Sequence, residues 1–283
     1  MRVALTGGSG FTGRYVAAAL DQQGIDSFDL DADLTDASAV DRAVEEATFD
    51  GLIHLAGRAF VDASDWEAFY QVNQLGTYHL LHAVARVRPG TRCVLASSAQ
   101  VYGQGAEGLI AEDAPTAPAN HYAVSKLAME LGAVRWGDRL ELVVTRPFNY
   151  TGVGQATNYL IPKIVEHFRC RASVIELGNL WVKRDFGDVR SVARAYAGLM
   201  TASAPPSLVN VCSGQVWSIQ DILSVLGELS GHRPEVVTNA AFVRRDDPAL
   251  LGGDADLLRA TLPEWSPHQL PDTLLWMYEH EST

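Results

Sequence analysis

The feature that most limits how this chain can fold is a glycine-rich segment directly after a short apolar run. The run at 2–6 reads as a strand, and 11–23 carries apolar residues at helical spacing. Between them, Gly7, Gly10 and Gly13 form the pattern GxxGxxG. A strand, a glycine loop and a helix in this order predict a dinucleotide phosphate site, because glycines allow a tight turn, a close approach of the backbone to a pyrophosphate and close packing of the helix. The alternative is a glycine-rich turn that binds nothing.

Strand-type and helix-type runs alternate through the first half of the chain. The expected strands are 2–6, 27–30, 51–55, 92–97 and 141–146, and the expected helices are 11–23, 37–47, 66–87 and 122–136. This alternation is typical of a parallel sheet that is covered by helices on both faces. We therefore expect an α/β fold, a Rossmann-type doubly wound parallel sheet with a smaller C-terminal substrate lobe.

The division of the chain follows from where this rhythm loosens, which is after Pro147. We expect 1–150 to form an NAD(P)-binding Rossmann domain and 151–283 to form a lobe that binds the substrate. The chain is expected to return to the first domain at about 186–211. The two parts are therefore interleaved rather than joined by a linker.

Composition excludes several classes of partner. The 22 Lys and Arg residues stand against 34 Asp and Glu, a formal net charge of −12, which disfavours nucleic acid and anionic membrane surfaces. Cys93, Cys170 and Cys212 lie far apart without CxxC spacing, so we expect no disulfide framework and no metal site. No signal peptide or membrane-spanning run is apparent, and we expect a cytoplasmic protein. An anionic ligand would need a locally basic site.

A tyrosine and a lysine four residues apart are the first catalytic candidates. Tyr122 and Lys126 begin the expected helix 122–136, one turn apart on the same face. A free tyrosine has a pKa of about 10, and a nearby ammonium group stabilises its phenolate, which suits it to acid/base work. The alternative is a surface pair on a helix, since this spacing is common by chance.

The end of the second expected strand bears on the choice of cofactor. Asp29 and Asp31 stand where an acidic residue would bind the adenosine ribose, and no Arg or Lys follows to hold a 2′-phosphate. This favours NAD slightly over NADP, although Arg14 is a basic residue that would reverse the preference. Alternatively, both aspartates are solvated loop carboxylates.

Six motifs distributed over most of the chain resemble one known family. They are the glycine loop at 6–13, His-Leu-Ala-Gly at 54–57, Val-Asn-x-x-Gly-Thr at 72–77, Ser-Ser-Ala-Gln-Val-Tyr-Gly at 97–103, Tyr-x-x-x-Lys at 122–126 and Arg-Pro-Phe-Asn at 146–149. Together they resemble the extended short-chain dehydrogenase/reductases that act on nucleotide sugars. The segment after the second strand departs from that family, because the usual loop before Asp33 and Leu34 is missing.

The resemblance implies a role for each matching residue. Ser98 would polarise a sugar carbonyl, Tyr122 would be the acid/base, and Lys126 would bind the nicotinamide ribose. The full set expected to contact the cofactor is Gly7, Gly10, Phe11, Thr12, Gly13, Asp29, Asp33, Leu34, Leu55, Ala56, Gly57, Asn73, Tyr122, Lys126 and Phe148.

The second half is similar to GDP-4-keto-6-deoxy-mannose reductases and to their GDP-mannose dehydratase relatives. The residues that this similarity places at the substrate are Ser98, Asn149, Asn179, Leu180, Arg184 and Arg244, with Arg245 as an alternative to the last. Arginines there would hold a diphosphate in bidentate fashion. Alternatively, Arg184 forms a salt bridge with Asp185 or Asp188, and Arg244 lies in a solvated loop.

The resemblance also predicts the reaction. Ala99 and Gln100 occupy positions where dehydratases carry an acid, which disfavours dehydration. We expect NAD(P)H-dependent reduction of the C4 ketone of a nucleotide-linked 4-keto-6-deoxyhexose, most simply a GDP-sugar. A 4-epimerase that holds NAD tightly and a non-catalytic dinucleotide sensor are the alternatives. The helices 66–87 and 122–136 are expected to form a homodimer through a four-helix bundle, as in that family.

Overall fold

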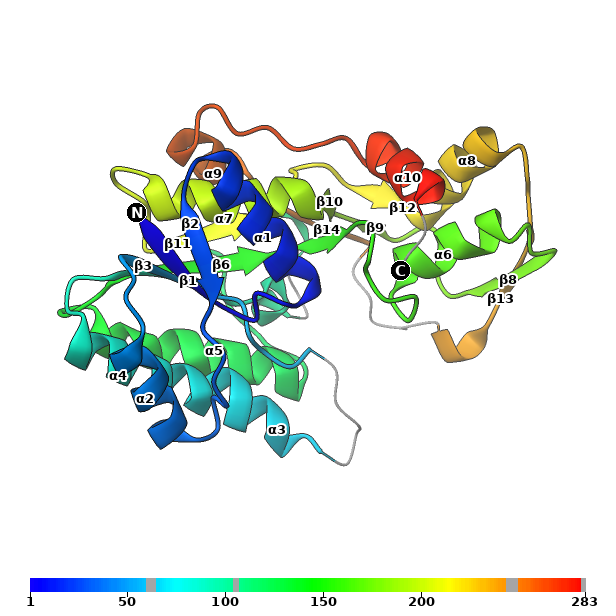
Figure 1. Ribbon diagram of the computed structural model, residues 1–283. Coiled ribbons are helices and arrows are strands. Elements are labelled where there is room, and N and C mark those ends of the chain that lie inside the picture. The colour runs from blue at the N-terminus through cyan, green and yellow to red at the C-terminus, as the bar shows by residue number, and fades with distance from the viewer. Residues whose placement is uncertain (60–64, 104–106, 243–248, 281–283) are drawn as a thin grey trace.

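A computed structural model of the chain describes residues 1–59, 65–103, 107–242 and 249–280. Its centre is a six-stranded sheet in the order β11-β6-β4-β3-β1-β2, in which every neighbouring pair is parallel. The strands of this sheet are β1 (Arg2–Thr6), β2 (Asp26–Asp29), β3 (Gly51–His54), β4 (Arg92–Ala96), β6 (Glu141–Pro147) and β11 (Leu208–Val211). The predicted doubly wound α/β fold is confirmed (Figure 1).

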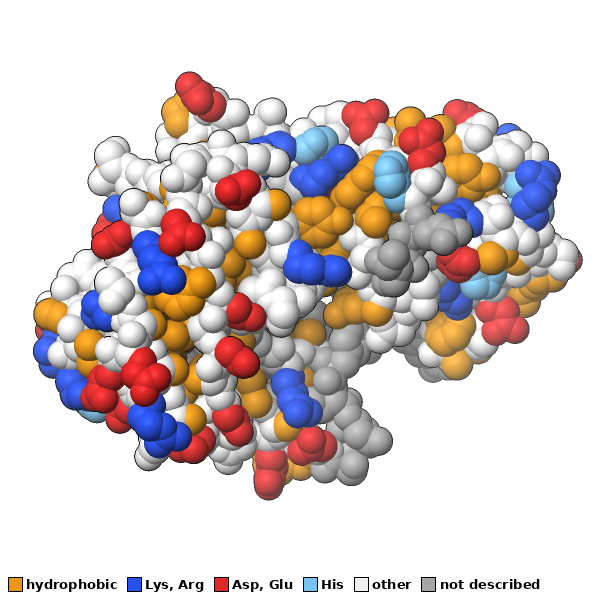
Figure 2. Space-filling model, viewed as in Figure 1, with side chains coloured by type: hydrophobic (Ala, Val, Ile, Leu, Met, Phe, Trp, Pro, Cys, Tyr) orange, Lys and Arg blue, Asp and Glu red, His pale blue; other side chains and the backbone are white. Residues whose placement is uncertain are grey.

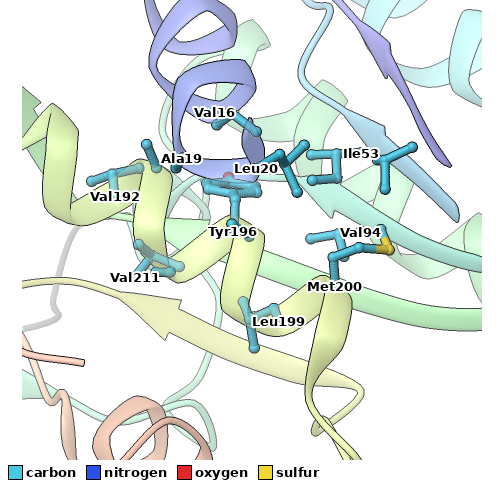
Figure 3. Packing of buried hydrophobic residues seen from close by; sticks show 14 of the residues in the cluster. Val16, Ala19, Leu20, Ile53, Val94, Val192, Tyr196, Leu199, Met200 and Val211 are labelled. Carbon is cyan, nitrogen blue, oxygen red and sulfur yellow. The ribbon is translucent and has the colours of Figure 1, made fainter. Parts of the chain in front are cut away.

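Helices cover both faces of this sheet because its strands are apolar on both sides. On one face, α1 (Phe11–Gln22) and α7 (Val189–Thr201) pack against residues such as Ile53 and Val94 (Figure 3). On the other, α2 (Ala37–Glu46), α4 (Thr77–Val87) and α5 (His121–Ala133) pack against Leu52 and Leu95. Neighbouring residues of one strand thus enter opposite cores, as the pleat requires.

The strand order places a switch point beside the glycine loop. The chain passes from β1 outward to β2 and then returns to the other side of β1 with β3. In open α/β sheets, the crevice at the carboxyl ends of the strands on either side of such a reversal is the usual ligand site. The loops after β1 and β3 border this crevice.

A second set of elements forms the lobe seen at the right of Figure 1. Its strands are β7 (Asn149–Thr151) with β10 (Phe186–Asp188), β8 (Val174–Leu177) with β13 (Glu235–Thr238), and the sheet β12 (Trp217–Ser218), β9 (Lys183–Arg184), β14 (Leu250–Gly253) and β5 (Gly108–Ile110). Its helices are α6 (Leu160–Arg169), α8 (Ile219–Ser230) and α10 (Leu270–Glu279), which share an apolar core. The short helix α9 (Asp256–Thr261) packs beside β11. Residues 189–211 return to the central sheet as α7 and β11.

Two expected helices differ in detail from prediction. The expected helix 66–87 is three consecutive segments, α3 (Glu67–Phe69), a π-helical stretch η1 (Tyr70–Gly76) and α4. The expected helix 122–136 begins one residue earlier, because the side chain of Asn120 caps it by accepting from Ala123 N at 2.9 Å, and it ends in the 3-10 turn Val134–Trp136. The Asp36 side chain caps α2 by accepting from Ser38 N and Ala39 N.

The distribution of charged side chains and the length of the helices are relevant to the expected absence of nucleic-acid and membrane partners. On the face drawn in Figure 2, acidic and basic side chains are interspersed over the Rossmann half, and hydrophobic side chains gather between that half and the lobe. Within the described ranges, no helix is long and apolar enough to cross a membrane.

Candidate active site

The glycine loop has the backbone geometry that a dinucleotide phosphate requires. Gly7 has a φ of +71°, which favours glycine, and a Cβ at Gly13 would lie 2.2 Å from Gly7 O. Helix α1 therefore packs against the loop at a distance that only glycine permits. No side chain caps α1 at Gly10, so the amides of its first turn remain directed at the crevice. This cradle fits a bound pyrophosphate.

Phe11 and Thr12, the next residues of α1, contact one tyrosine of the other half of the chain. The Phe11 ring is stacked on the Tyr150 ring with centroids 6.3 Å apart, and the hydroxyls of Thr12 and Tyr150 are 2.8 Å apart. Arg14 reaches the turn at Gly154, since its Nη2 lies 3.0 Å from where a Cβ there would be. The loop and the β7 segment are therefore in direct contact.

The acidic residues at the end of β2 and just after it accept hydrogen bonds from nearby groups of the chain. The Asp29 carboxylate accepts from Gly8 N at 2.9 Å and from Ser9 N at 3.1 Å, which places its charge beside the glycine loop. Asp33 accepts from the amide and hydroxyl of Thr35, and these hydrogen bonds hold its pKa below the usual value. The Leu34 side chain is buried in the core under α2 and α4.

The segment after β3 forms the opposite wall. Leu55 follows His54, and Ala56 N donates to Thr6 Oγ1 at 3.3 Å. A Cβ at Gly57 would lie 3.2 Å from Lys126 Nζ and 3.0 Å from Asn73 Oδ1. This wall therefore directly contacts the catalytic candidate Lys126.

Asn73 fixes the backbone of that wall. Its side-chain amide is fully buried on the π-helical stretch, accepts from Arg58 N at 2.8 Å, and donates to Arg58 O and Ser125 Oγ at 3.0 Å each. Ser125 lies between Tyr122 and Lys126, so Asn73 links the wall to the catalytic helix. A π-helical turn frequently marks a functional site, because it displaces one side chain from the regular helical position.

His54 is buried and has a structural role. Its ring nitrogens lie 2.6 Å from Thr6 Oγ1 and 2.8 Å from Thr77 Oγ1. Burial, with the Lys126 ammonium nearby, lowers the pKa of His54 to about 3, so the ring stays neutral. Among the described residues, no group of three or more His, Cys, Asp and Glu side chains is arranged to hold a metal ion.

Ser98, Tyr122 and Lys126 meet at the carboxyl end of β4. Burial raises the pKa of Tyr122 to about 12, while hydrogen bonding by the Ser98 hydroxyl partly offsets this shift. Lys126 Nζ donates to Ala96 O at 2.7 Å, and burial lowers the pKa of Lys126 to about 8, against the opposing effect of the Glu130 carboxylate. At neutral pH, the phenol is thus protonated and the amine is charged.

The residues expected at the substrate are divided between the two halves. Asn149 is exposed at the start of β7, and the preceding residue Phe148, which was expected at the cofactor, is buried against Tyr102. In the lobe, Asn179 is exposed and accepts from Trp181 N at 3.2 Å, while Leu180 packs against the lobe core. Arg244 and Arg245 lie outside the described residues.

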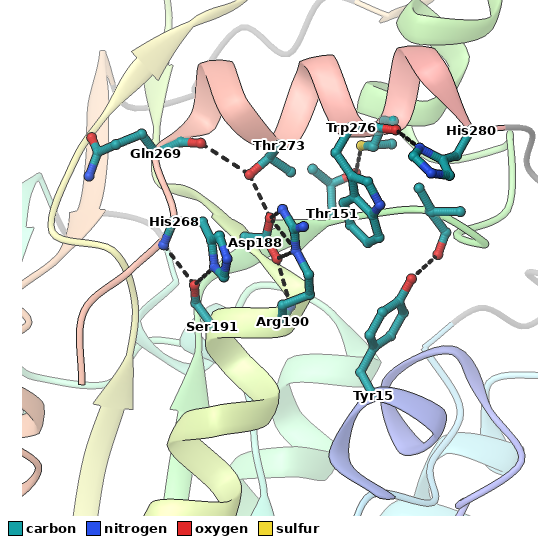
Figure 4. Close-up of polar contacts among 12 residues, drawn as sticks. Tyr15, Thr151, Asp188, Arg190, Ser191, His268, Gln269, Thr273, Trp276 and His280 are labelled. Carbon is teal, nitrogen blue, oxygen red and sulfur yellow. Dashed lines mark hydrogen bonds and ion pairs between the residues drawn. The ribbon is translucent and has the colours of Figure 1, made fainter. Parts of the chain in front are cut away.

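Arg184 lies on β9, where its Nη1 donates to Lys183 O at 2.7 Å. The two carboxylates suggested as its partners are occupied otherwise. Asp188 pairs with Arg190 at 2.7 Å and accepts from Thr273 (Figure 4), and Asp185 accepts from Ser213 and Gly214. Within the described ranges, no ion pair joins Arg184 to either aspartate.

The lobe sheet reaches the catalytic half through β14. Gly253 lies so close to Phe148 and Cys212 that a Cβ there would be 2.7 Å from the Phe148 ring and 2.5 Å from Cys212 Sγ. Arg184 is on the strand next to β14 in this sheet. The arrangement thus joins a dinucleotide cradle, a Ser-Tyr-Lys group and a lobe carrying an arginine.

Two nearby residues were not predicted. Tyr150 follows Asn149, and its contact with α1 depends on a fold that brings β7 to the glycine loop. Glu130 lies four residues after Lys126, and this helical spacing is a signal that was available in the sequence.

Comparisons with known proteins find relatives that match most of the chain. The model of the NAD dependent epimerase/dehydratase family matches residues 3–212. GDP-6-deoxy-D-talose 4-dehydrogenase of Aggregatibacter actinomycetemcomitans is 34% identical over 265 residues, covering 91% of this chain and 90% of that protein. GDP-6-deoxy-D-mannose reductase of Pseudomonas aeruginosa is 34% identical over 282 residues, covering 94% and 92%.

A solved structure is similar to the chain in its fold. RMD from Pseudomonas aeruginosa, complexed with NADPH, superposes with a TM-score of 0.88 at 31% identity, covering 98% of this chain and 96% of that one. The resemblance to extended short-chain dehydrogenase/reductases is confirmed, and the chain belongs to the NAD dependent epimerase/dehydratase family.

Proposed function

We propose that the protein reduces the C4 ketone of a nucleotide-linked 4-keto-6-deoxyhexose, with GDP as the nucleotide. The observation that carries this proposal is the meeting of Ser98, Tyr122 and Lys126 beside a dinucleotide cradle. The names of two relatives that span more than nine-tenths of the chain support the substrate class. A non-catalytic dinucleotide sensor would need neither the serine nor the Tyr–Lys pair.

The chemistry assigned to these residues is proton donation to a carbonyl oxygen. When bound, a reduced nicotinamide supplies a hydride to sugar C4. The Ser98 hydroxyl donates a hydrogen bond to the C4 oxygen, and the Tyr122 phenol gives that oxygen its proton. The Lys126 ammonium stabilises the phenolate that remains, and it holds the ribose. The pKa of about 12 keeps Tyr122 in the donating form at neutral pH.

We propose that NADH is preferred over NADPH. The Asp29 carboxylate lies against the glycine loop, and Asp31 and Asp33 follow within a few residues, all exposed at the end of β2. A 2′-phosphate there would meet like charge. Arg14, the basic residue that would offset this charge, reaches toward Gly154. The ratio of kcat/KM for the two reduced cofactors tests this preference, and a ratio favouring NADPH would overturn it.

We propose that Gly178, Asn179, Leu180 and Arg184 form the nucleotide side of the site. The lobe that carries them is built mainly from 151–283, with β5 and β7 contributed by the preceding part of the chain. Under this proposal GDP stabilises the fold by mass action, by about 2.7 kcal/mol at a hundredfold excess over its dissociation constant. UDP and dTDP should stabilise it less at equal concentration. Equal or larger melting shifts with UDP would reject guanine as the base.

The reaction itself is tested with purified protein, a panel of nucleotide 4-ketosugars and both reduced cofactors, followed by NMR of the product. A stoichiometric consumption of reduced cofactor identifies a reductase. A 4-epimerase, which the family's name also admits, would interconvert C4 epimers without net consumption and would retain NAD through turnover. Formation of product without net oxidation of the cofactor would therefore show that the protein is a 4-epimerase and not a reductase.

We also propose that the protein is a cytoplasmic homodimer. The outer face of the helical layer carries large exposed apolar side chains, with Leu131 67% and Val134 70% exposed and Leu75 at the edge of the same layer. Burying such side chains in a two-fold four-helix bundle removes them from water. Cys93, Cys170 and Cys212 are all free thiols, which suits a reducing compartment.

A further inference from the structure

We propose that Glu130 is a positioning residue of the catalytic site, one that aligns the end of β4 with helix α5 and places a negative charge one helical turn from the Lys126 ammonium. The effects expected on the kcat/KM profile rest on the proposed function. The effects expected on thermal unfolding depend only on the residues of this chain.

The carboxylate of Glu130 is buried and has three donors. It accepts from Arg146 Nε at 3.1 Å, from Arg146 Nη2 at 2.6 Å and from the Ser97 hydroxyl. The two charged side chains are only 8% and 7% exposed. A bidentate pair of this kind fixes geometry as well as charge, because both oxygens are held in the plane of the guanidinium.

The position of this pair relative to the catalytic residues is what gives it a role. Tyr122, Lys126 and Glu130 occur at intervals of four on one face of α5. They contact three consecutive residues at the end of β4: the Tyr122 phenol meets Ser98, Lys126 donates to Ala96 O, and Glu130 binds the Ser97 hydroxyl. Glu130 thus completes a three-point attachment that sets where the Ser98 hydroxyl lies relative to the phenol.

The ion pair is supported from outside by elements that lead to the lobe. The Arg146 guanidinium lies over the Tyr102 ring, 4.7 Å from its centroid, and its Nη1 donates to Glu112 O at 3.4 Å. Tyr102 in turn donates to Asn210 Oδ1 at 2.8 Å. These contacts join the 3-10 turn Ala99–Tyr102, β6 and β11 to the catalytic helix.

The effect of the Glu130 charge on the pKa of Lys126 follows from the groups that surround the ammonium. Tyr122 and Glu130 are on its own helix, neutral His54 faces it from β3, and Arg146 stands beyond Glu130 on β6. The Glu130 carboxylate is the group that opposes the effect of burial on the pKa of Lys126, which is about 8. Glu112 and Tyr102 border Arg146 rather than the ammonium.

The kinetic test compares Glu130→Gln with the wild type. Without the carboxylate, Lys126 loses its proton at lower pH, and activity requires the charged amine. The alkaline limb of the kcat/KM profile should move down by about one to two pH units, from the Coulomb energy of charges about 6 Å apart at an effective dielectric of about 20. Glu130→Asp retains the charge, so it should keep the limb close to that of the wild type.

A matched control separates this effect from simple destabilisation. Asp188→Asn removes another buried carboxylate, which is paired with Arg190 and accepts from Thr273 (Figure 4) and is not among the groups that shift the pKa of Lys126. Removing one partner of a buried pair destabilises the fold in both variants. The alkaline limb of Asp188→Asn should nevertheless stay where the wild type has it. If both variants leave the limb in place, or both move it equally, the positioning role is wrong.

Thermal unfolding without substrate or cofactor gives an independent readout. The folded pKa of Lys126 lies below the unfolded value, so stability rises with pH from about 8 to about 10.5 as the buried ammonium is lost. In Glu130→Gln this rise begins at lower pH, and the melting-temperature deficit against the wild type should shrink between about pH 7 and 8.5. A deficit that is constant with pH, as expected for Asp188→Asn, would refute the inference. This outcome stands even if no 4-ketosugar is reduced.

Discussion

Gly13 is the position where a single methyl group should separate cofactor binding from folding. In Gly13→Ala the new Cβ would lie 2.2 Å from Gly7 O and 2.6 Å from both Gly8 Cα and Gly8 O. All three are backbone atoms, so no side chain can rotate away to relieve the contact. Helix α1 and the loop must instead separate by about 1 Å to restore ordinary carbon–oxygen contact.

The size of the effect follows from that displacement. A shift of about 1 Å carries an amide beyond hydrogen-bond distance of a phosphate oxygen that it held before. Hydrogen bonds to charged groups contribute about 1.5–3 kcal/mol each, so the loss of two weakens NADH binding about 10²- to 10⁴-fold. Overpacking itself should cost about 1–3 kcal/mol of stability.

Gly198→Ala is the matched control, because it also adds a methyl to a packed helix on the same face of the sheet. There the nearest atom is Leu262 Cδ1 at 2.8 Å, the end of a flexible side chain, so it should affect stability and leave NADH affinity unchanged. Melting temperature and NADH titration by calorimetry give both quantities for each variant. If Gly13→Ala bound NADH within threefold of the wild type, the assignment of this loop to the dinucleotide would fail.

The remaining predictions concern the acid/base pair, the cofactor and the assembly. Tyr122→Phe should reduce turnover about 10²- to 10⁴-fold with unchanged NADH affinity, whereas Lys126→Ala should weaken NADH binding as well. Fluorescence titration of NADH together with steady-state kinetics distinguishes the two variants. Near-normal turnover of Tyr122→Phe would exclude the catalytic assignment. In the wild type, the rate of reduction should fall as pH rises through about 8, because Lys126 loses its charge there; a profile that is flat to pH 10 would contradict this. Asp29→Asn should raise kcat/KM with NADPH relative to NADH, and no change in the ratio would remove Asp29 from the specificity argument. Light scattering at micromolar concentration should give a dimer, and Leu131→Glu combined with Val134→Glu should give a monomer; a monomeric wild type would defeat the bundle.

Patterns of neighbouring residues were sufficient to predict those elements whose structure depends on residues close together in the sequence. Glycine spacing predicted the loop between β1 and α1, and apolar runs predicted every strand of the central sheet except β11, because each depends on residues that are neighbours along the chain. Alternation of strands and helices then predicted the doubly wound fold.

Longer-range features could not be read in this way. Strand β5 (Gly108–Ile110) pairs with β14 (Leu250–Gly253), and strands this short have no periodicity of their own, so their pairing depends on how the lobe packs. The π-helical stretch Tyr70–Gly76 is another case. Its sequence is helical in type, and the irregular turn accompanies the contacts of Asn73 with the backbone of Arg58 in another segment.

In the candidate site, too, some residues could be predicted from their neighbours in the sequence and others could not. Tyr122 and Lys126 were found because one helical turn separates them. Glu130 is one further turn along, but its significance comes from Arg146 on β6 and Ser97 on β4, which only the folded sheet brings to it. The role expected for Leu34 was drawn from its place in a motif, whereas burial under α2 and α4 directs its side chain into the core.

Gln100 connects the local and long-range features and limits the chemistry of the site. Its side-chain oxygen accepts from Asn120 Nδ2 at 3.2 Å, and Asn120 in turn caps the helix that carries Tyr122. The amide therefore supports the start of the catalytic helix, and it is too weak an acid to transfer a proton to a departing hydroxyl. The acid available at the end of β4 is then the Tyr122 phenol, with Ser98 beside it. A site with this set of donors can protonate an oxygen that stays on the sugar, which fits reduction or epimerisation at C4 and does not supply the acid that elimination of water would need.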